Sequence, residues 1–102
     1  MGAVDGFTLR VEENGQGPVV WVSGDLDIAT APLLRDCLEG CDGQRVTIDL
    51  SGVTFLDSGG LAVLTERHLK VGPESLVLRG VQPAQMKILE ITRLDDVLNF
   101  DE

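Results

Sequence analysis

The chain has 102 residues, which suits one domain, and its 43% hydrophobic content is enough for a single core and too high for a disordered chain. Its net charge of −9 disfavours DNA, RNA and anionic membranes as partners, because like charges repel, and makes a basic protein surface the more natural counterpart. The sequence has no apolar run that could span a membrane and no secretory signal at its start, so the expected location is the cytoplasm.

In chain order, the predicted elements begin with strands and then alternate between helices and strands. Apolar–polar alternation and short apolar runs indicate strands, whereas apolar residues three and four apart indicate helices. The predicted elements are a strand over 7–12, a strand over 18–24, a helix capped by Thr30 and ended by Gly40, a strand over 45–50, a helix over 58–71, a strand over 76–78, a helix over 83–91 and a short strand over 97–100.

This order predicts one α/β domain over residues 1–102, with a mixed sheet of four to five strands. The first two strands form an antiparallel hairpin, and right-handed crossovers make the later strands parallel. The strand over 45–50 keeps Thr47 and Asp49 on one side, which implies helices mainly on the other face. Trp21, in the second strand, is expected to lie in the core.

Parallel strands end at one edge of the sheet, where ligand and partner sites gather. Three loops are expected to meet there, at residues 24–29, 51–60 and 80–82, so Ser58 should lie near Asp25 and Asp27. Asp25 and Asp27 could also be solvated loop acids.

The second loop leads into a helix whose first turn contains two glycines, Gly59 and Gly60, each of which costs about 1 kcal/mol relative to alanine. Bare backbone at this point suits the close approach of another molecule. Asp57 or Ser58 could instead serve only as the helix N-cap, but an N-cap does not need the glycine pair.

Three chemistries could use this edge. Hydrolysis by Ser58 would need a histidine close to its hydroxyl. The only histidine, His68, lies about 15 Å away along the same predicted helix, so this chemistry is excluded. Magnesium-assisted phosphoryl transfer could use the carboxylates of Asp25, Asp27 and Asp57, but no lysine or arginine stands near them in the sequence to hold a phosphate. Regulated binding is favoured, since the helix dipole tolerates a phosphate on Ser58, whose added charge of roughly −1.5 to −2 would displace a partner. We therefore expect no enzyme activity, no metal and no cofactor.

Three segments carry a family resemblance. VTIDLSGVTFLDSGGLAVL, residues 46–64, resembles the central segment of the STAS domain, in particular that of bacterial anti-sigma-factor antagonists. VSGDLDIATAPLLRD is similar to the family's acidic stretch and first helix, and ILEITRLDDVLNF to its third helix and last strand. The resemblance extends from Phe7 to Phe100.

The resemblance implies a switch between partners. The unphosphorylated protein would bind an anti-sigma factor that is also a serine kinase and so free a sigma factor, until the kinase phosphorylates Ser58 and a serine phosphatase resets it. The alternative is a STAS subunit of a larger cytoplasmic complex, either a stress-signalling scaffold or a lipid-transport complex. Family members usually continue into a final helix, which is expected to be absent or truncated in this chain. The expected partner contacts are Asp25, Asp27, Ile28, Thr30, Asp57, Ser58, Gly59 and Gly60.

Overall fold

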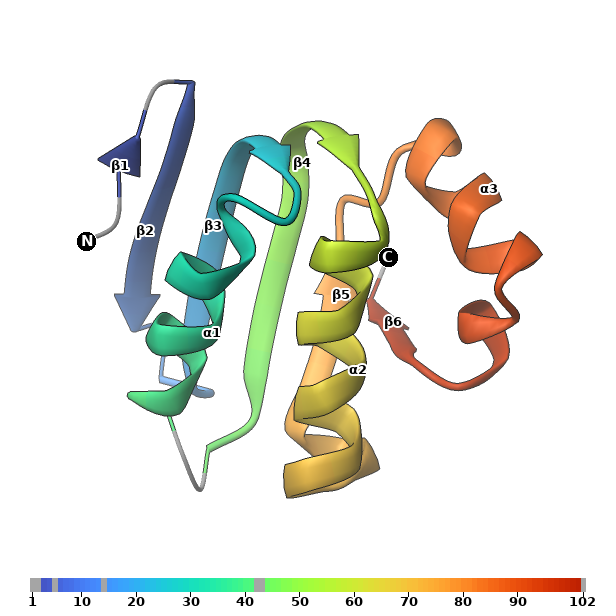
Figure 1. The fold of residues 1–102 in the computed structure, drawn as a ribbon. Coiled ribbons are helices and arrows are strands. Elements are labelled where there is room, and N and C mark those ends of the chain that lie inside the picture. The colour runs from blue at the N-terminus through green and yellow to red at the C-terminus, as the bar shows by residue number, and fades with distance from the viewer. Residues whose placement is uncertain (1–2, 5, 14, 42–43, 102) are drawn as a thin grey trace.

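The computed structural model describes residues 3–4, 6–13, 15–41 and 44–101, which form a six-stranded sheet and three α-helices (Figure 1). The strands are β1 (Ala3–Val4), β2 (Phe7–Glu13), β3 (Pro18–Leu26), β4 (Val46–Leu56), β5 (Leu76–Arg79) and β6 (Asn99–Asp101). The α-helices are α1 (Ala31–Glu39), α2 (Ser58–Val71) and α3 (Pro83–Ile91), and the short 3-10 turns are η1 (Pro73–Ser75) and η2 (Leu94–Asp96). Among the described residues, no helix combines the length and apolarity needed to cross a bilayer.

The strands follow chain order across the sheet. The pairs β1–β2 and β2–β3 are antiparallel, and the pairs from β3 to β6 are parallel. Because every parallel crossover moves in the same direction along the sheet, right-handed connections place α1, α2 and α3 on one face, as Figure 1 shows. The predicted mixed sheet with helices on one face is confirmed, and the two-residue β1 is an edge strand that the sequence did not predict.

Two strands run farther toward the carboxyl edge than predicted. The strand predicted over 45–50 extends to Leu56, and the one predicted over 18–24 extends to Leu26, so the loops predicted over 51–60 and 24–29 begin too early. Their pairing shifts register twice, between Trp21 and Ser23 and again between Gly24 and Asp25. Such bulges break the alternation by which a strand is recognised in a sequence. The last strand is also shifted, to Asn99–Asp101, because η2 precedes it.

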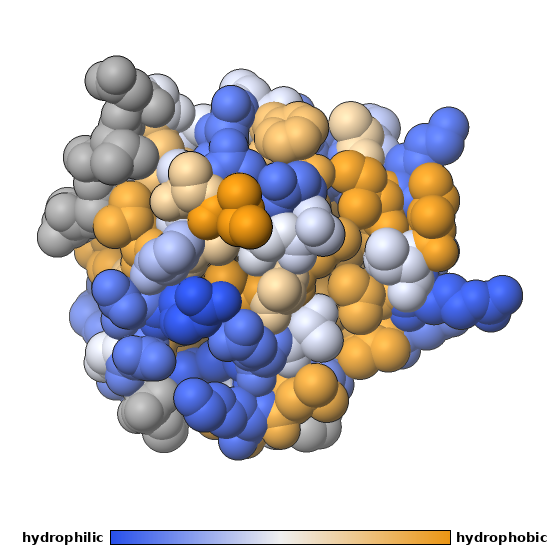
Figure 2. All heavy atoms as spheres, viewed as in Figure 1, coloured by the Kyte–Doolittle hydropathy of each residue, from blue (hydrophilic) through white to orange (hydrophobic). Residues whose placement is uncertain are grey.

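The helix-bearing side of the molecule is not uniform. Figure 2 shows mostly hydrophilic side chains over α1 and a gathering of hydrophobic ones over α2 and α3. Leu69 near the end of α2 and Ile91 at the end of α3 are among the large apolar side chains that remain exposed. Apolar side chains that solvent can reach on two helices are a possible contact surface.

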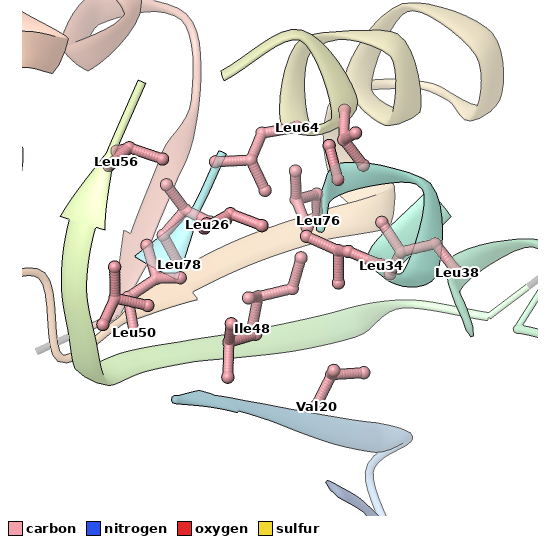
Figure 3. Close-up of a cluster of buried hydrophobic side chains, with 14 of the residues drawn as sticks. Val20, Leu26, Leu34, Leu38, Ile48, Leu50, Leu56, Leu64, Leu76 and Leu78 are labelled. Atoms are coloured by element: carbon pink, nitrogen blue, oxygen red, sulfur yellow. The ribbon is translucent and has the colours of Figure 1, made fainter. Parts of the chain in front are cut away.

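The core lies between this helical layer and the sheet (Figure 3). Leucines of α1 and α2, including Leu34 and Leu64, pack against aliphatic residues of the central strands such as Ile48 and Leu78. The buried guanidinium of Arg67 donates hydrogen bonds to the backbone carbonyls of Leu38, Cys41 and Gln44. These bonds fasten the end of α1 and the turn after it to α2.

Two cysteines lie in the last turn of α1 and just after that helix. Cys37 is half-buried and Cys41 is buried. Burial is the main cause that raises the pKa of the Cys37 thiol, so it is less reactive than an exposed cysteine.

On the other face of the sheet, no helix formed by the described residues covers the strands. Trp21 lies there half-buried, with the guanidinium of Arg10 5.2 Å and that of Arg79 4.9 Å from its ring centre. The prediction that Trp21 belongs to the core is wrong, because its neighbours Val20 and Val22 take the core face of β3 and Trp21 points the other way.

Candidate functional site

The start of α2 is built around Asp57. This residue has an extended backbone, and its side chain accepts hydrogen bonds from the backbone N–H groups of Gly59, at 2.8 Å, and Gly60, at 3.3 Å. Asp57 is therefore the N-cap, and α2 begins at Ser58 as predicted. The cap function that either residue could have filled belongs to Asp57, so the exposed side chain of Ser58 is not needed for it.

The two glycines are required by the chain's own packing. A Cβ on Gly59 would lie 2.7 Å from Cα and 2.8 Å from N of Ile28, and one on Gly60 would lie 2.8 Å from the carbonyl oxygen of Leu26. The space that a side chain would need at either position is taken by the end of β3 and the loop after it, so the chain's own packing is sufficient reason for both glycines. Gly59 and Gly60 let that loop rest directly on the first turn of α2.

The loop between β3 and α1 is held by its own hydrogen bonds. The Asp27 carboxylate accepts from the backbone N–H groups of Ala29, at 3.0 Å, and Thr30, at 3.1 Å. The Thr30 hydroxyl donates to the carbonyl oxygen of Asp25 at 2.7 Å, and this residue is buried. The backbone N–H of Asp57 donates to the carbonyl oxygen of Leu26 at 3.3 Å, which joins this loop to the start of α2 as the sequence predicted.

Each of the three aspartates at this edge has a local task. Asp25 accepts a hydrogen bond from the Thr54 hydroxyl at 2.7 Å, Asp27 holds its own loop, and Asp57 caps α2. Across the part of the chain that the structure describes, no group of three or more acidic, histidine or cysteine side chains could hold a metal ion. The carboxylates therefore shape this edge and do not converge on a common point.

Only some of the predicted site residues are exposed at this edge of the sheet. Ile28 is 79% exposed, and its backbone lies against Gly59, next to the exposed Ser58. Asp25 is also exposed, whereas Thr30 and Gly60 are buried and can act only through the residues they support. We call the exposed residues Asp25, Ile28 and Ser58 the Ser58 edge.

An aspartate within β4 lies in different surroundings, which the sequence did not reveal. Asp49 is buried, accepts hydrogen bonds from the backbone N–H and hydroxyl of Ser51, and pairs with the guanidinium of Arg79 at 2.8 Å. Burial alone would raise its pKa, but the hydrogen bonds from Ser51 and the pairing with Arg79 outweigh burial and lower the pKa below its usual value. The Asp49 group is thus a structural ion pair at the point where β4 bulges.

Comparison with known proteins assigns the family. A family model described as "Mlab, STAS domain" matches residues 9–99, which is most of the chain. The chain therefore belongs to the STAS domain family, as the resemblance implied.

Individual relatives carry a more specific name. The anti-sigma-B factor antagonist of Listeria monocytogenes is 33% identical over 100 residues, covering 92% of this chain and 88% of the relative. The protein of the same name from Staphylococcus aureus is 33% identical over 103 residues, covering 94% and 95%.

Solved structures agree with the fold. The crystal structure of an anti-sigma factor antagonist from Mycobacterium paratuberculosis matches with a TM-score of 0.84 at 33% identity, covering 98% of this chain and 89% of that one. The unphosphorylated form of the antagonist SpoIIAA matches with a TM-score of 0.67 at 15% identity, covering 93% and 88%. The second match is too distant in sequence to show more than a shared fold.

Proposed function

We propose that this protein is an anti-sigma factor antagonist that acts by partner switching. It binds an anti-sigma factor that is also a serine kinase and thereby frees a sigma factor for transcription. The kinase inactivates it by phosphorylating Ser58, and a serine phosphatase restores it. The names of the relatives at 33% identity support the first part of this proposal, and the surroundings of Ser58 support the second.

One observation carries the proposal. Asp57 supplies the N-cap of α2, so the Ser58 side chain lies exposed in the first turn with no part in capping. Its exposed neighbour Ile28 offers an apolar contact of the kind that anchors protein interfaces. A serine that is free to react beside an apolar anchor suits a surface that both binds a kinase and is modified by it.

The chemistry of release follows from charge. Phosphorylation would add roughly −1.5 to −2 charges beside Asp57, at an edge that already carries Asp25 and Asp27. A helix N-terminus tolerates an anion, so α2 is expected to keep its structure. A partner that docks on this edge would then face both added charge and added bulk where Ile28 and Ser58 had been accessible.

The test is to map the modified residue. The protein is incubated with ATP, Mg²⁺ and the anti-sigma kinases encoded in its own genome, and the products are analysed by mass spectrometry. Phosphate is expected on Ser58, and Ser58→Ala should take up none. Label on Ser23, Ser51 or Ser75, with Ser58 untouched, would refute the proposal.

The proposed role includes no turnover by this chain. His68 lies on the same helix as Ser58, ten residues further along, and cannot reach its hydroxyl. Hydrolysis of ATP, GTP and phosphoesters should stay at background with Mg²⁺ present. Activity that disappears in Asp25→Asn or Asp57→Asn would instead revive a magnesium-dependent reaction.

A second candidate, a STAS subunit of a larger cytoplasmic complex, is favoured by the apolar side chains far from the Ser58 edge. Leu69 and Ile91 are 76% and 72% exposed on α2 and α3. Hydrophobic side chains gather over these two helices (Figure 2). The double variant Leu69→Ser/Ile91→Ser separates the two roles. If the Ser58 edge is the contact, the double variant should still bind the anti-sigma factor. If the helical side is the contact, the double variant should lose this binding.

A further inference from the structure

The loop over 80–82 reaches the same edge and has no part in the proposed function. Gln82 occupies the N-cap position of α3, yet its side chain makes no cap hydrogen bond to that helix. N-cap positions favour Ser, Thr, Asp and Asn, whose short side chains reach the first N–H groups. A glutamine at this position therefore suggests a task outside α3.

The side chain of Gln82 extends to β4 instead. Its Nε2 group donates to the carbonyl oxygens of Ser51, at 2.8 Å, and Val53, at 2.9 Å. The Nε2 group of Gln85, a buried residue in the first turn of α3, lies 3.4 Å from the same Val53 oxygen. Two side-chain amides thus converge on one short piece of strand.

This piece of β4 lacks a neighbouring strand on that side. The pairing of β4 with β5 ends at Asp49 and Arg79, while β4 continues to Leu56. A free strand edge leaves backbone carbonyls without partners. Gln82 supplies donors that a longer β5 would have supplied, directly before the chain enters Asp57 and Ser58.

We propose that Gln82 is a positioning residue for Ser58, an inference that rests on the proposed function. On one side, β3 pairs with β4 along its length, and the last hydrogen bond between them runs from the Asp57 N–H to the Leu26 carbonyl oxygen. On the other side, Gln82 holds Ser51 and Val53. With both sides held, Ser58 is presented to a kinase or partner in one orientation, and α3 is mechanically linked to the site of modification.

The variant Gln82→Ser separates positioning from helix stability. Serine is a favoured N-cap and keeps α3 capped, but it is too short to reach β4. Ala84→Ser, at an exposed position in the same helical turn, is the matched control. In the free protein, amide hydrogen exchange over residues 51–57 should be about tenfold faster in Gln82→Ser, with exchange in α3 unchanged, while the control matches wild type throughout.

Unchanged exchange over 51–57, or an equal rise in β2, would overturn the inference. Phosphorylation kinetics with the kinase-type anti-sigma factor give the second measurement. In Gln82→Ser the KM for the protein substrate should rise several-fold while kcat stays the same, because the bound serine is still phosphorylated normally. An unchanged KM together with faster exchange would also overturn the positioning role. If wild type takes up no phosphate on Ser58, the proposed function fails, and the exchange data still decide whether Gln82 holds β4.

Discussion

An aspartate is followed closely by a serine at two places in the chain, once within β4 and once directly after it, and the two sites differ in almost every respect. At Asp49 and Ser51 the carboxylate is buried, the serine hydroxyl donates to it, and Arg79 balances the charge. At Asp57 and Ser58 the carboxylate caps a helix, and the serine side chain is exposed. The same residue types thus build a closed ion pair in one place and an accessible hydroxyl in the other.

The difference comes from what each carboxylate must satisfy. Asp49 lies inside the sheet, where a buried charge needs a cation and hydrogen bonds, and the serine is one of those donors. Asp57 lies at the end of the strand, where the N–H groups of Gly59 and Gly60 already satisfy it. The Ser58 hydroxyl therefore has no part in capping and stays accessible, as the proposed modification requires, whereas Ser51 is committed to its own fold.

The largest expected effect comes from the glycines that set up the second site. Gly60→Ala should lower the free energy of unfolding by about 3 kcal/mol, since its Cβ would meet the Leu26 carbonyl and the Leu56 side chain at 2.8 and 2.7 Å. Gly40→Ala is the control, because there the nearest atom is 3.4 Å away. Chemical denaturation of both variants measures the effect, and an equal loss in both would contradict the packing argument.

The next largest loss of stability is expected from breaking the ion pair between Asp49 and Arg79. Arg79→Ala should lower the free energy of unfolding by about 2 kcal/mol, because it leaves the Asp49 carboxylate buried without its cation, although Arg79 itself is partly exposed.

The lowered pKa of Asp49 also makes the stability of the protein depend on pH. A carboxyl whose pKa is lower in the folded protein stabilises the fold above its unfolded pKa of about 3.9 and loses that contribution as the pH falls through its folded value. The midpoint temperature of thermal denaturation should therefore fall less steeply between neutral pH and pH 3 for Asp49→Asn than for wild type.

Removing the N-cap of α2 should destabilise the protein less than either of these changes. Asp57→Ala should destabilise the protein by about 1 kcal/mol, because two N–H groups of the first turn lose their acceptor. Asp57→Asn keeps an acceptor and should recover most of the loss. Urea denaturation distinguishes the two variants, and equal destabilisation by both would mean that the charge of Asp57, not its hydrogen bonds, is what matters.

The smallest effects sharpen the contrast between the serines. Ser51→Ala should cost about 1 kcal/mol, since its hydroxyl bonds a buried carboxylate. Ser58→Ala should change stability by less than about 0.5 kcal/mol, as is usual at the surface. If parallel denaturation curves show that Ser58→Ala is the more damaging of the two, the assignment of Ser58 as a free group is wrong.

The sequence predicted those parts of the site that depend on local pattern. Residues 58–71 form a helix as predicted, because capping and apolar spacing act within a few residues. The pairing of Asp49 with Arg79 and the reach of Gln82 to Ser51 join residues about thirty positions apart. They depend on how β4 lies beside β5 and the start of α3, so no local pattern contains them. The packing role of Gly59 and Gly60 was missed because Leu26 and Ile28, which they meet, are about thirty positions away, at the end of β3 and in the loop after it.

The central claim is that the state of Ser58 decides whether a partner stays bound. Dissociation constants for a kinase-type anti-sigma factor should be measured with wild type, Ser58→Ala and Ser58→Glu at two salt concentrations, with circular dichroism to confirm folding. Ser58→Ala should bind about as well as wild type and resist release by ATP, whereas Ser58→Glu should bind more weakly. Part of that weakening should fade with added salt, because exposed charges are screened over about 8 Å at physiological ionic strength. Equal affinity of folded Ser58→Glu and wild type would contradict the account and leave Ser58 as the first residue of a helix with no switching role.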